Sequence, residues 1–283
     1  MAKLAENEVL ALQKTALNVR KKILRMIKAG KSGHVGGALS AADIVTALYF
    51  RVMRVDPDNP RWRERDRFVL SAGHKCLALY AVLAEKKFFD EQILDTYGAL
   101  ESKLPGHPDM HKLPGVETNT GALGHGLAIA GGMAMGLRMD RLDSKVYVLL
   151  GDGELAEGSN WEAAAACSHH HLDNILAFID RNTLQISGKT VDVMSYEPLH
   201  ERFKAFGWSV REIDGHDFEQ IVNNAVDIPF QRGKPSVIIA DTIKSKGFSF
   251  AEGRVEYHHW KTRPEEIRIA ERDLADIGRS LDV

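Results

Sequence analysis

The sequence has few cysteines and prolines, and neither sign of charge is in excess. Among 283 residues there are two cysteines, Cys76 and Cys167, and nine prolines. So few cysteines argue against a disulfide framework and favour a reducing compartment. Lys plus Arg number 37 and Asp plus Glu 39, which gives a formal net charge of -2. Without a basic excess, neither nucleic acid nor an anionic membrane is an expected partner.

Long apolar runs and targeting signals are also missing. The longest nearly uncharged run that we identify, at about 126–137, is too short to span a bilayer. Residues 1–7 lack the basic-then-apolar pattern of a signal peptide. No linker or low-complexity tract divides the chain. We therefore expect a cytoplasmic globular protein whose residues 1–283 form one domain.

Glycine, in contrast, is abundant and clustered. Of the 24 glycines, four lie within 30–37, six within 121–136 and three within 151–158. Flexible linkers combine glycine with serine, whereas these glycines stand among apolar residues and histidines. Such clusters are typical of loops whose backbone approaches a ligand closely.

Short apolar runs predict strands, and amphipathic stretches between them predict helices. Because the runs are continuous rather than alternating, we expect strands buried on both faces of a mainly parallel sheet. The fold class is therefore α/β, a three-layer α/β/α sandwich. The predicted strands are 67–71, 145–150, 174–179, 208–213 and 236–241, and the predicted helices are 5–29, 41–52 with Ser40 as N-cap, 76–86, 161–168 and 265–281.

A candidate metal and phosphate site follows two of these strands. Asp152, flanked by Gly151 and Gly153, ends one predicted strand, and Asn182 ends the next. Parallel strands joined by a helix end at the same edge of the sheet, where ligands of α/β proteins bind. A carboxylate and an amide oxygen suit Mg²⁺, with phosphate oxygens and water completing its shell.

Taken alone, Gly-Asp-Gly is better explained as a tight turn between strand and helix. The distance to Asn182 favours the ligand site, because GDG followed after 28 residues by asparagine resembles the thiamine diphosphate motif. That motif usually ends in two asparagines, and this chain has Arg181-Asn182.

Five motifs together, in order along the chain, resemble the diphosphate-binding half of transketolases, from the first helix to His258. They are SGHVGG at 32–37, SAGH at 71–74, GHP at 106–108, TGALGHG at 120–126 and GDGELAEG at 151–158. A generic nucleotide-binding domain is a weaker interpretation, since neither GxGxxG nor GxxxxGK[ST] follows the first predicted strand.

The resemblance implies a thiamine diphosphate-binding fold with Mg²⁺, which Ca²⁺ or Mn²⁺ can replace. Imidazole, with a pKa of about 6.5, suits the proton movements of two-carbon ketol transfer, while the carbanion belongs to the cofactor's ring. The residues that the resemblance assigns are His34, His107, His258 and Glu157 as catalytic, His74, Gly121, Leu123, Gly153 and Asn182 as cofactor-binding, and Asp152, Asn182 and the Leu184 carbonyl as metal ligands.

Several positions stay open. Tyr257-His258-His259-Trp260 offers two candidates for one active-site histidine, of which we choose His258. Lys75 stands where the family often has a small residue, and its cation either aids phosphate binding or faces solvent. His125 stands where the family commonly has glutamine. Consecutive residues on a helix point about 100° apart, so residues 169–171, all histidine, cannot together chelate one ion and are expected to be structural.

The family's cofactor-activating glutamate belongs to a pyrimidine-binding domain that follows the diphosphate domain. The sequence ends at Val283 without it. We therefore expect a separately encoded C-terminal subunit, in an α2β2 assembly, to supply that glutamate and most contacts to sugar phosphate substrates, as in a transketolase of the pentose phosphate pathway. The alternatives are a subunit of a deoxyxylulose-phosphate synthase-like or keto-acid dehydrogenase-like enzyme, a variant for a non-phosphate sugar acid such as a sulfo-sugar, and a non-catalytic homologue.

Overall fold

A parallel sheet of five strands forms the centre of the computed structural model, which describes residues 4–282. Every neighbouring pair of strands in this sheet is parallel. All five predicted strands are confirmed to within two residues at either end. In spatial order they are β2 (Arg67–Leu70), β3 (Val146–Gly151), β4 (Ile175–Arg181), β8 (Ser236–Asp241) and β7 (Ser209–Asp214).

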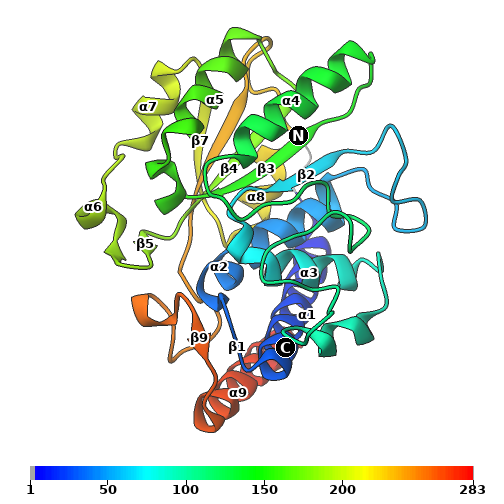
Figure 1. Cartoon of the computed structure of the whole chain (residues 1–283), viewed down its shortest axis with the longest axis vertical. Coiled ribbons are helices and arrows are strands. Elements are labelled where there is room, and N and C mark those ends of the chain that lie inside the picture. The colour runs from blue at the N-terminus through cyan, green and yellow to red at the C-terminus, as the bar shows by residue number, and fades with distance from the viewer. Residues whose placement is uncertain (1–3, 283) are drawn as a thin grey trace.

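Helices cover both faces of the sheet, which confirms the three-layer sandwich (Figure 1). Successive strand residues point to opposite faces, so Leu149 and Phe178 join one core while Val148 and Ile179 join the other. The first core also contains residues of α1 (Glu6–Gly30), α2 (Val35–Ala47), α3 (Cys76–Glu85), α8 (Phe218–Ala225) and α9 (Pro264–Ser280). The second contains residues of α4 (Gly126–Met139), α5 (Gly158–His169) and α7 (Leu199–Ala205).

The prediction that Ser40 caps a helix was wrong. Helix α2 begins at Val35 with His34 as its N-cap, and Ser40 lies inside it. The Ser40 hydroxyl donates instead to Oδ2 of Asp180 at 2.6 Å, on strand β4. A serine in a helix interior thus serves a tertiary contact, which its local sequence does not reveal.

The longest apolar stretch was also misidentified. Residues Val35–Val52, which join α2 to a π-helical turn (Leu48–Val52), are long and apolar enough to cross a membrane, and 83% of that window is buried in the fold. Every residue of α2 is buried. Its apolar character is therefore explained by its position between the sheet, α1 and α3.

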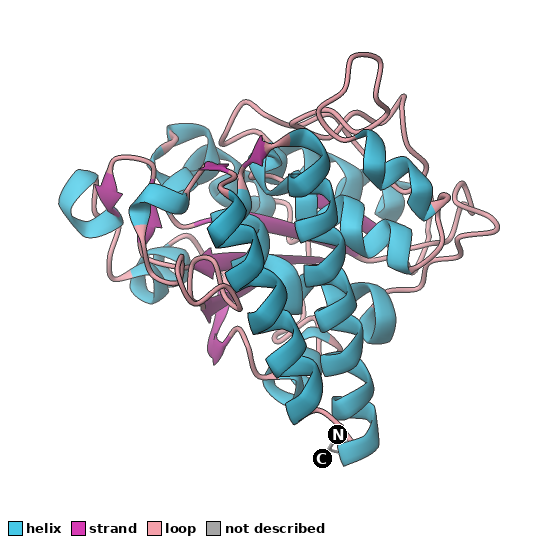
Figure 2. Cartoon of the chain, turned by 90° about the horizontal axis from the view of Figure 1, so that it is seen from below, coloured by secondary structure: helices cyan, strands magenta, loops and turns pink. Residues whose placement is uncertain are grey.

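The shorter elements gather with the loops that carry the motifs. A two-stranded ribbon pairs β1 (Ser32–Gly33) with β9 (Trp260–Lys261), and a second pairs β5 (Leu184–Gln185) with β6 (Gly188–Lys189), followed by α6 (Thr190–Val193). In Figure 2 long helices lie in front of the strands of the main sheet, and long loops lie beside them. Short 3₁₀ turns complete this set, at Gly73–Lys75, Glu91–Thr96, Gly153–Ala156 and Val255–Tyr257.

Candidate active site

One cavity of about 440 Å³ collects every residue that the sequence predicts for the site. It lies at the carboxyl edge of the sheet, where β3 and β4 end. The predicted residues that line it are His34, His74, His107, Gly121, Leu123, Asp152, Gly153, Glu157, Asn182, Leu184 and His258. Residues separated by more than 200 positions are thus brought to one place by the topology of the sheet.

Histidines form one wall of this cavity, with His34 at the centre. Its ring centroid lies 5.5 Å from that of His74, 6.1 Å from that of His107 and 5.5 Å from that of His258. Burial, together with nearby cationic and imidazole groups, lowers the pKa of His34 to about 4, of His74 to about 2 and of His258 to about 3. These three imidazoles are therefore neutral at pH 7, so each has one nitrogen that donates and one that accepts a hydrogen bond.

Both histidines of the pair at 258 and 259 contact His34. His258 lines the cavity, and its Nδ1 lies 3.0 Å from Nζ of Lys244, which donates to it. The His259 ring meets His34 edge-on, with centroids 4.7 Å apart, and lines a neighbouring cavity instead. His258 therefore borders the candidate site cavity, and His259 borders the neighbouring cavity.

The predicted metal ligands converge next to the histidines. Oδ1 of Asp152 accepts from the Gly153 amide at 2.9 Å, and Oδ2 accepts from the Thr183 amide at 2.7 Å. The latter bond ties Asp152 to the residue that follows Asn182. Burial and the nearby Asp180 carboxylate raise the pKa of Asp152 to about 6. Each carboxylate oxygen keeps a lone pair beyond the one that the backbone uses.

Asp180 fixes the orientation of the Asn182 amide. Nδ2 of Asn182 donates to Oδ2 of Asp180 at 3.3 Å, so the amide oxygen is on the other side, where it accepts from the Leu184 amide at 3.2 Å. The Leu184 carbonyl accepts from Nζ of Lys244 at 2.7 Å. This carbonyl therefore already faces a cation, and carboxylate, amide and carbonyl oxygens together are a donor set for a hard divalent ion.

The space around these groups fits an anionic cofactor. A Cβ atom on Gly153 would lie 2.9 Å from Oε1 of Gln185, and one on Gly37 would lie 3.0 Å from Cε of Lys75. The hydroxyl of Thr120, next to Gly121, is buried and has no hydrogen-bond partner. Gly153 and Gly37 let the side chains of Gln185 and Lys75 pack against the backbone at the cavity wall. With the ammonium groups of Lys75 and Lys244 in the lining and the carboxylate, amide and carbonyl oxygens of the donor set beside them, the lining fits a diphosphate held with a divalent cation.

Two lysines line the cavity, although neither was assigned a role. Lys75, for which solvent exposure was one alternative, is only 2% exposed and pairs with fully buried Asp180 at 2.6 Å. Burial and the nearby Lys75 lower the pKa of Lys244 to about 8. The sequence contained one signal that could have identified Lys244 as a site residue. It closely follows the end of β8, and ligands of α/β proteins bind at the carboxyl ends of the strands.

Glu154 holds three of the motifs together. Its buried carboxylate accepts hydrogen bonds from the Ser71 hydroxyl, the Gly124 amide and the Gly151 amide. Burial raises the pKa of this carboxyl. The sequence motif contains Glu154, but its role as a link between distant loops depends on tertiary contacts that no local pattern encodes.

The remaining candidates lie at the rim or outside. Glu157 lines the cavity with an exposed side chain. His125 is the N-cap of α4, and its Nδ1 lies 3.1 Å from the Leu123 carbonyl oxygen. His169 ends α5, and His170 and His171 follow it, with Nη1 of Arg138 donating to the carbonyl oxygens of these last two. Within residues 4–282 no group of three His, Cys, Asp or Glu side chains is arranged to hold a metal.

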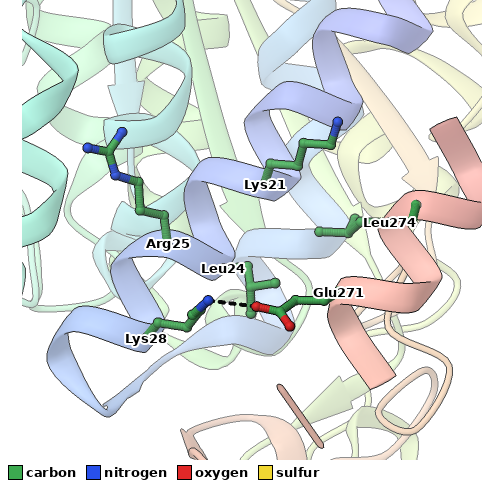
Figure 3. Close-up of a pocket in the computed structure, with 7 residues that line it drawn as sticks. Lys21, Leu24, Arg25, Lys28, Glu271 and Leu274 are labelled. Atoms are coloured by element: carbon green, nitrogen blue, oxygen red, sulfur yellow. Dashed lines mark hydrogen bonds and ion pairs between the residues drawn. The ribbon is translucent and has the colours of Figure 1, made fainter. Parts of the chain in front are cut away.

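A further hollow lies between α1 and α9, away from all predicted site residues (Figure 3). Its lining combines Leu24 and Leu274 with charged side chains, and Nζ of Lys28 pairs with Glu271 at 2.6 Å across it. Since it contains no histidine, phosphate-binding loop or metal donor set, the cavity at the sheet edge is the candidate active site.

Comparison with known proteins agrees with this geometry. Residues 12–275 match the family model described as transketolase, thiamine diphosphate binding domain. The chain is 46% identical over 263 residues to a subunit of the apulose-4-phosphate transketolase of Phocaeicola vulgatus, covering 93% of each protein. It is 44% identical to the 6-deoxy-6-sulfo-D-fructose transketolase subunit SqwG of a Clostridium species, covering 94% of this chain and 97% of the relative.

Solved structures give the same result. The crystal structure of transketolase from Campylobacter jejuni superposes with a TM-score of 0.86 at 36% identity, covering 93% of this chain and 42% of that one. This chain therefore spans less than half the length of that transketolase but nearly all of the two subunit relatives. The chain belongs to the transketolase family and carries its thiamine diphosphate binding domain.

Proposed function

We propose that this chain is the diphosphate- and metal-binding subunit of a two-subunit transketolase, which transfers a two-carbon ketol unit from a ketose to an aldose. The observation that carries the proposal is the single cavity that joins a hard-cation donor set to a wall of histidines, of which His34, His74 and His258 are neutral at pH 7. The donor set suits a divalent cation beside a diphosphate. The histidines suit proton movement at the oxygens of a sugar.

Asp152, Asn182 and the Leu184 carbonyl would hold Mg²⁺, with Ca²⁺ or Mn²⁺ able to replace it. His74, Gly121 and Gly153 would meet the cofactor beside this ion, and Leu123 would lie under its aminopyrimidine ring. The hydrogen bonds that orient Asp152 and Asn182, and the place of all these residues in the lining of one cavity, support this arrangement. All of these residues lie in regions that the chain itself folds, so metal and diphosphate binding should be properties of this subunit.

Thiamine diphosphate, held by these residues, would supply the carbanion chemistry of two-carbon transfer. The protein's part is to bind the sugar, orient it and move protons at its oxygens. His34, His107 and His258 would do so, because their imidazoles border the cavity and the two with lowered pKa values, His34 and His258, are neutral at pH 7. Glu157, exposed at the rim, would join a proton-relay network with the partner chain.

A separately encoded C-terminal subunit would complete the site, in an α2β2 assembly. Two observations support it: the named subunit relatives have nearly the same length as this chain, and the cavity's rim is exposed, with Ile186 at 70% exposure. That partner would supply the cofactor-activating glutamate. We propose that residues 1–283 are one domain of the assembly, in the cytoplasm, where the two free cysteines would stay reduced.

The sugar substrates are proposed by class only. The names of the relatives include a sugar phosphate and a sulfo-sugar, so we expect a ketose donor with an anionic group at its far end. Contacts to that group would lie mainly on the partner.

Reconstitution tests the proposal. This chain, the candidate partner and their mixture are assayed with thiamine diphosphate and Mg²⁺ for transfer from a ketose phosphate to ribose 5-phosphate. We expect activity from the mixture alone, and its loss in Asp152→Ala and Asn182→Ala with the fold intact by circular dichroism. Activity of this chain alone would exclude the two-subunit proposal, and unchanged cofactor binding in the Asp152→Ala complex would exclude the metal site.

A further inference from the structure

A second cavity of about 440 Å³ adjoins the candidate cofactor cavity. His34 and His107 line both, so these two side chains form the partition between them. The other walls of the second cavity come from the glycine-rich turn at 30–34 and the loop at 97–107. The proposed roles of the chain place no group in this space.

The fold sets His259 against this partition. Strands β1 and β9 are antiparallel, with Gly33 opposite Trp260. His34 follows Gly33 and His259 precedes Trp260, so both stand directly beyond this last pair of the ribbon, which brings them close together. The two rings accordingly meet at 4.7 Å with their planes 82° apart. His259 therefore reaches the second cavity because of backbone pairing rather than by chance rotation of its side chain.

Buried anchors on both sides hold the histidine pair in place. Nε1 of Trp260 donates to Oε2 of Glu266 at 2.7 Å, and the Tyr257 hydroxyl donates to Oε1 of the same carboxylate at 2.8 Å. Glu266 is only 7% exposed and lies in the first turn of α9. One carboxylate thus fixes the residues before and after the pair, which pre-organises both imidazoles.

The two cavities differ in their charged groups. The cofactor cavity contains the ammonium groups of Lys75 and Lys244 together with the carboxylates of Asp152, Glu154 and Glu157, a set that suits a diphosphate held with a divalent cation. The described lining of the second cavity has only Lys112 and Glu101 as lysine or carboxylate side chains, both exposed, and their charges offset each other. Its other polar side chains carry hydroxyls and imidazoles, from Ser32, Tyr97, Ser102, His34, His107 and His259.

The chemistry of these groups suits a chain of hydroxyl-bearing carbons. Among residues 4–282 no hydrogen bond is made to either ring nitrogen of His259, whose side chain is exposed to the cavity. An imidazole both donates and accepts, as a sugar hydroxyl does, so the two are matched partners. A diphosphate, in contrast, would meet no buried cation there.

We propose that the second cavity receives the sugar substrate and that His259 hydrogen-bonds one of its hydroxyl groups, as a specificity-determining residue. The inference rests on the proposed function. His258 then meets the reacting end of the sugar beside the cofactor, and His259 meets its hydroxyl-bearing chain, with His34 between them.

Chemical protection tests this assignment without requiring turnover. The reconstituted complex is treated with diethyl pyrocarbonate, and modified histidines are located by mass spectrometry. We expect ribose 5-phosphate to protect His259, and thiamine diphosphate with Mg²⁺ to protect His74 but not His259. If the cofactor alone protects His259, or the sugar fails to, the assignment is wrong. Because no catalysis is needed, this result stands even if the complex transfers no ketol group.

Kinetics of matched variants give the second measure. In His259→Asn we expect the KM of at least one sugar to rise by about tenfold or more with kcat little changed, since a lost hydroxyl contact weakens ground and transition states alike. Cofactor affinity measured by calorimetry should stay within about twofold of wild type. His169→Asn, an exposed histidine beyond the site, is the control and should change neither. Unchanged KM values in an active His259→Asn complex would overturn the proposal while leaving the proposed function intact.

Discussion

Nζ of Lys75 donates a hydrogen bond to Oδ2 of Asp180 at 2.6 Å, and the two side chains are 2% and 0% exposed. Asp180 also accepts from the Ser40 hydroxyl and from Nδ2 of Asn182. Burial raises the pKa of Asp180, but the nearby Lys75 and the hydrogen bonds from Lys75 and from the Ser40 and Thr242 hydroxyls hold it below its ordinary value. This ion pair therefore connects α2, the start of α3 and β4 directly behind a proposed metal ligand.

Replacing Lys75 should lower the free energy of unfolding, because the buried Asp180 carboxylate then has no cation beside it. Lys75→Met leaves the Asp180 carboxylate without its cation, and breaking a buried pair in this way costs about 3–5 kcal/mol of unfolding free energy. Urea denaturation measures the loss. The double variant Lys75→Met/Asp180→Asn removes the unpaired charge and should recover part of it. A loss below about 1 kcal/mol in Lys75→Met, the size of a surface pair, would contradict the buried-pair account.

Substitution by alanine should lower stability at Gly124 and raise it at Gly132. Gly124 has a φ of +85°, and a Cβ there would lie 2.5 Å from Cβ of Glu157, so Gly124→Ala should distort the loop and lower stability by at least about 1–3 kcal/mol. Gly132 lies inside α4 with nothing within 4 Å of its Cβ position, so Gly132→Ala should raise stability by about 0.5–1 kcal/mol. Thermal or urea unfolding distinguishes them. Equal effects would contradict the assigned packing.

The histidine wall predicts a stability that falls with acidification. In the folded chain burial lowers the pKa values of His34, His74 and His258 below the ordinary 6.5. Below pH 6.5 the unfolded chain therefore binds more protons at these groups, and stability decreases as pH falls from 7 towards 5. The carboxyls of Asp152, Glu154 and Glu117, whose pKa values burial raises, act in the opposite direction, so the contribution of the histidines is measured by removing one of them.

Urea midpoints at pH 7 and pH 5 measure this slope in the cofactor-free chain. His74→Gln removes one of the three groups and should flatten the dependence, whereas His169→Gln, exposed beyond the site, should not. The same slope in His74→Gln as in wild type would show that the wall does not cause it.

The Glu266 anchor predicts a local effect. Glu266→Ala deprives Tyr257 and Trp260 of their acceptor, and each hydrogen bond to a charged group contributes about 1.5–3 kcal/mol. We expect hydrogen exchange of the backbone amides at 257–262 to accelerate by at least about tenfold, with exchange in the central strand β4 unchanged. Glu266→Gln keeps one acceptor and should give a smaller effect. Uniform acceleration across the chain would indicate global destabilisation instead.

The strands were predictable because their signal is local. The run at 236–241 is apolar and β-branched throughout most of its length, and β8 has these same bounds. Helix α2 was placed wrongly at its start because Ser40 is a good N-cap in isolation, and its true partner, Asp180, lies 140 positions away. Short-range chemistry thus predicts elements, while their ends depend on contacts that only the fold creates.

The site was predictable to the extent that its residues stand in motifs at strand ends. Asp152 and Asn182 follow β3 and β4, and both line one cavity at that edge of the sheet. Lys244 belongs to no recognised motif, and its contact with the Leu184 carbonyl depends on β8 lying beside β4, which the sequence order does not show. The place of His259 was not predictable for a similar reason, since it is set by the pairing of β1 with β9.

The most direct test of the central claim follows two carbon atoms. A ketose phosphate labelled with ¹³C at its first two carbons is mixed with ribose 5-phosphate, thiamine diphosphate, Mg²⁺, this chain and its candidate partner, and the products are analysed by NMR. We predict that both labels move together to the first two carbons of the new ketose, only when both subunits are present, and not with Asp152→Ala. Labels that separate, or that move without this chain, would contradict its assignment as the cofactor-binding half of a transketolase.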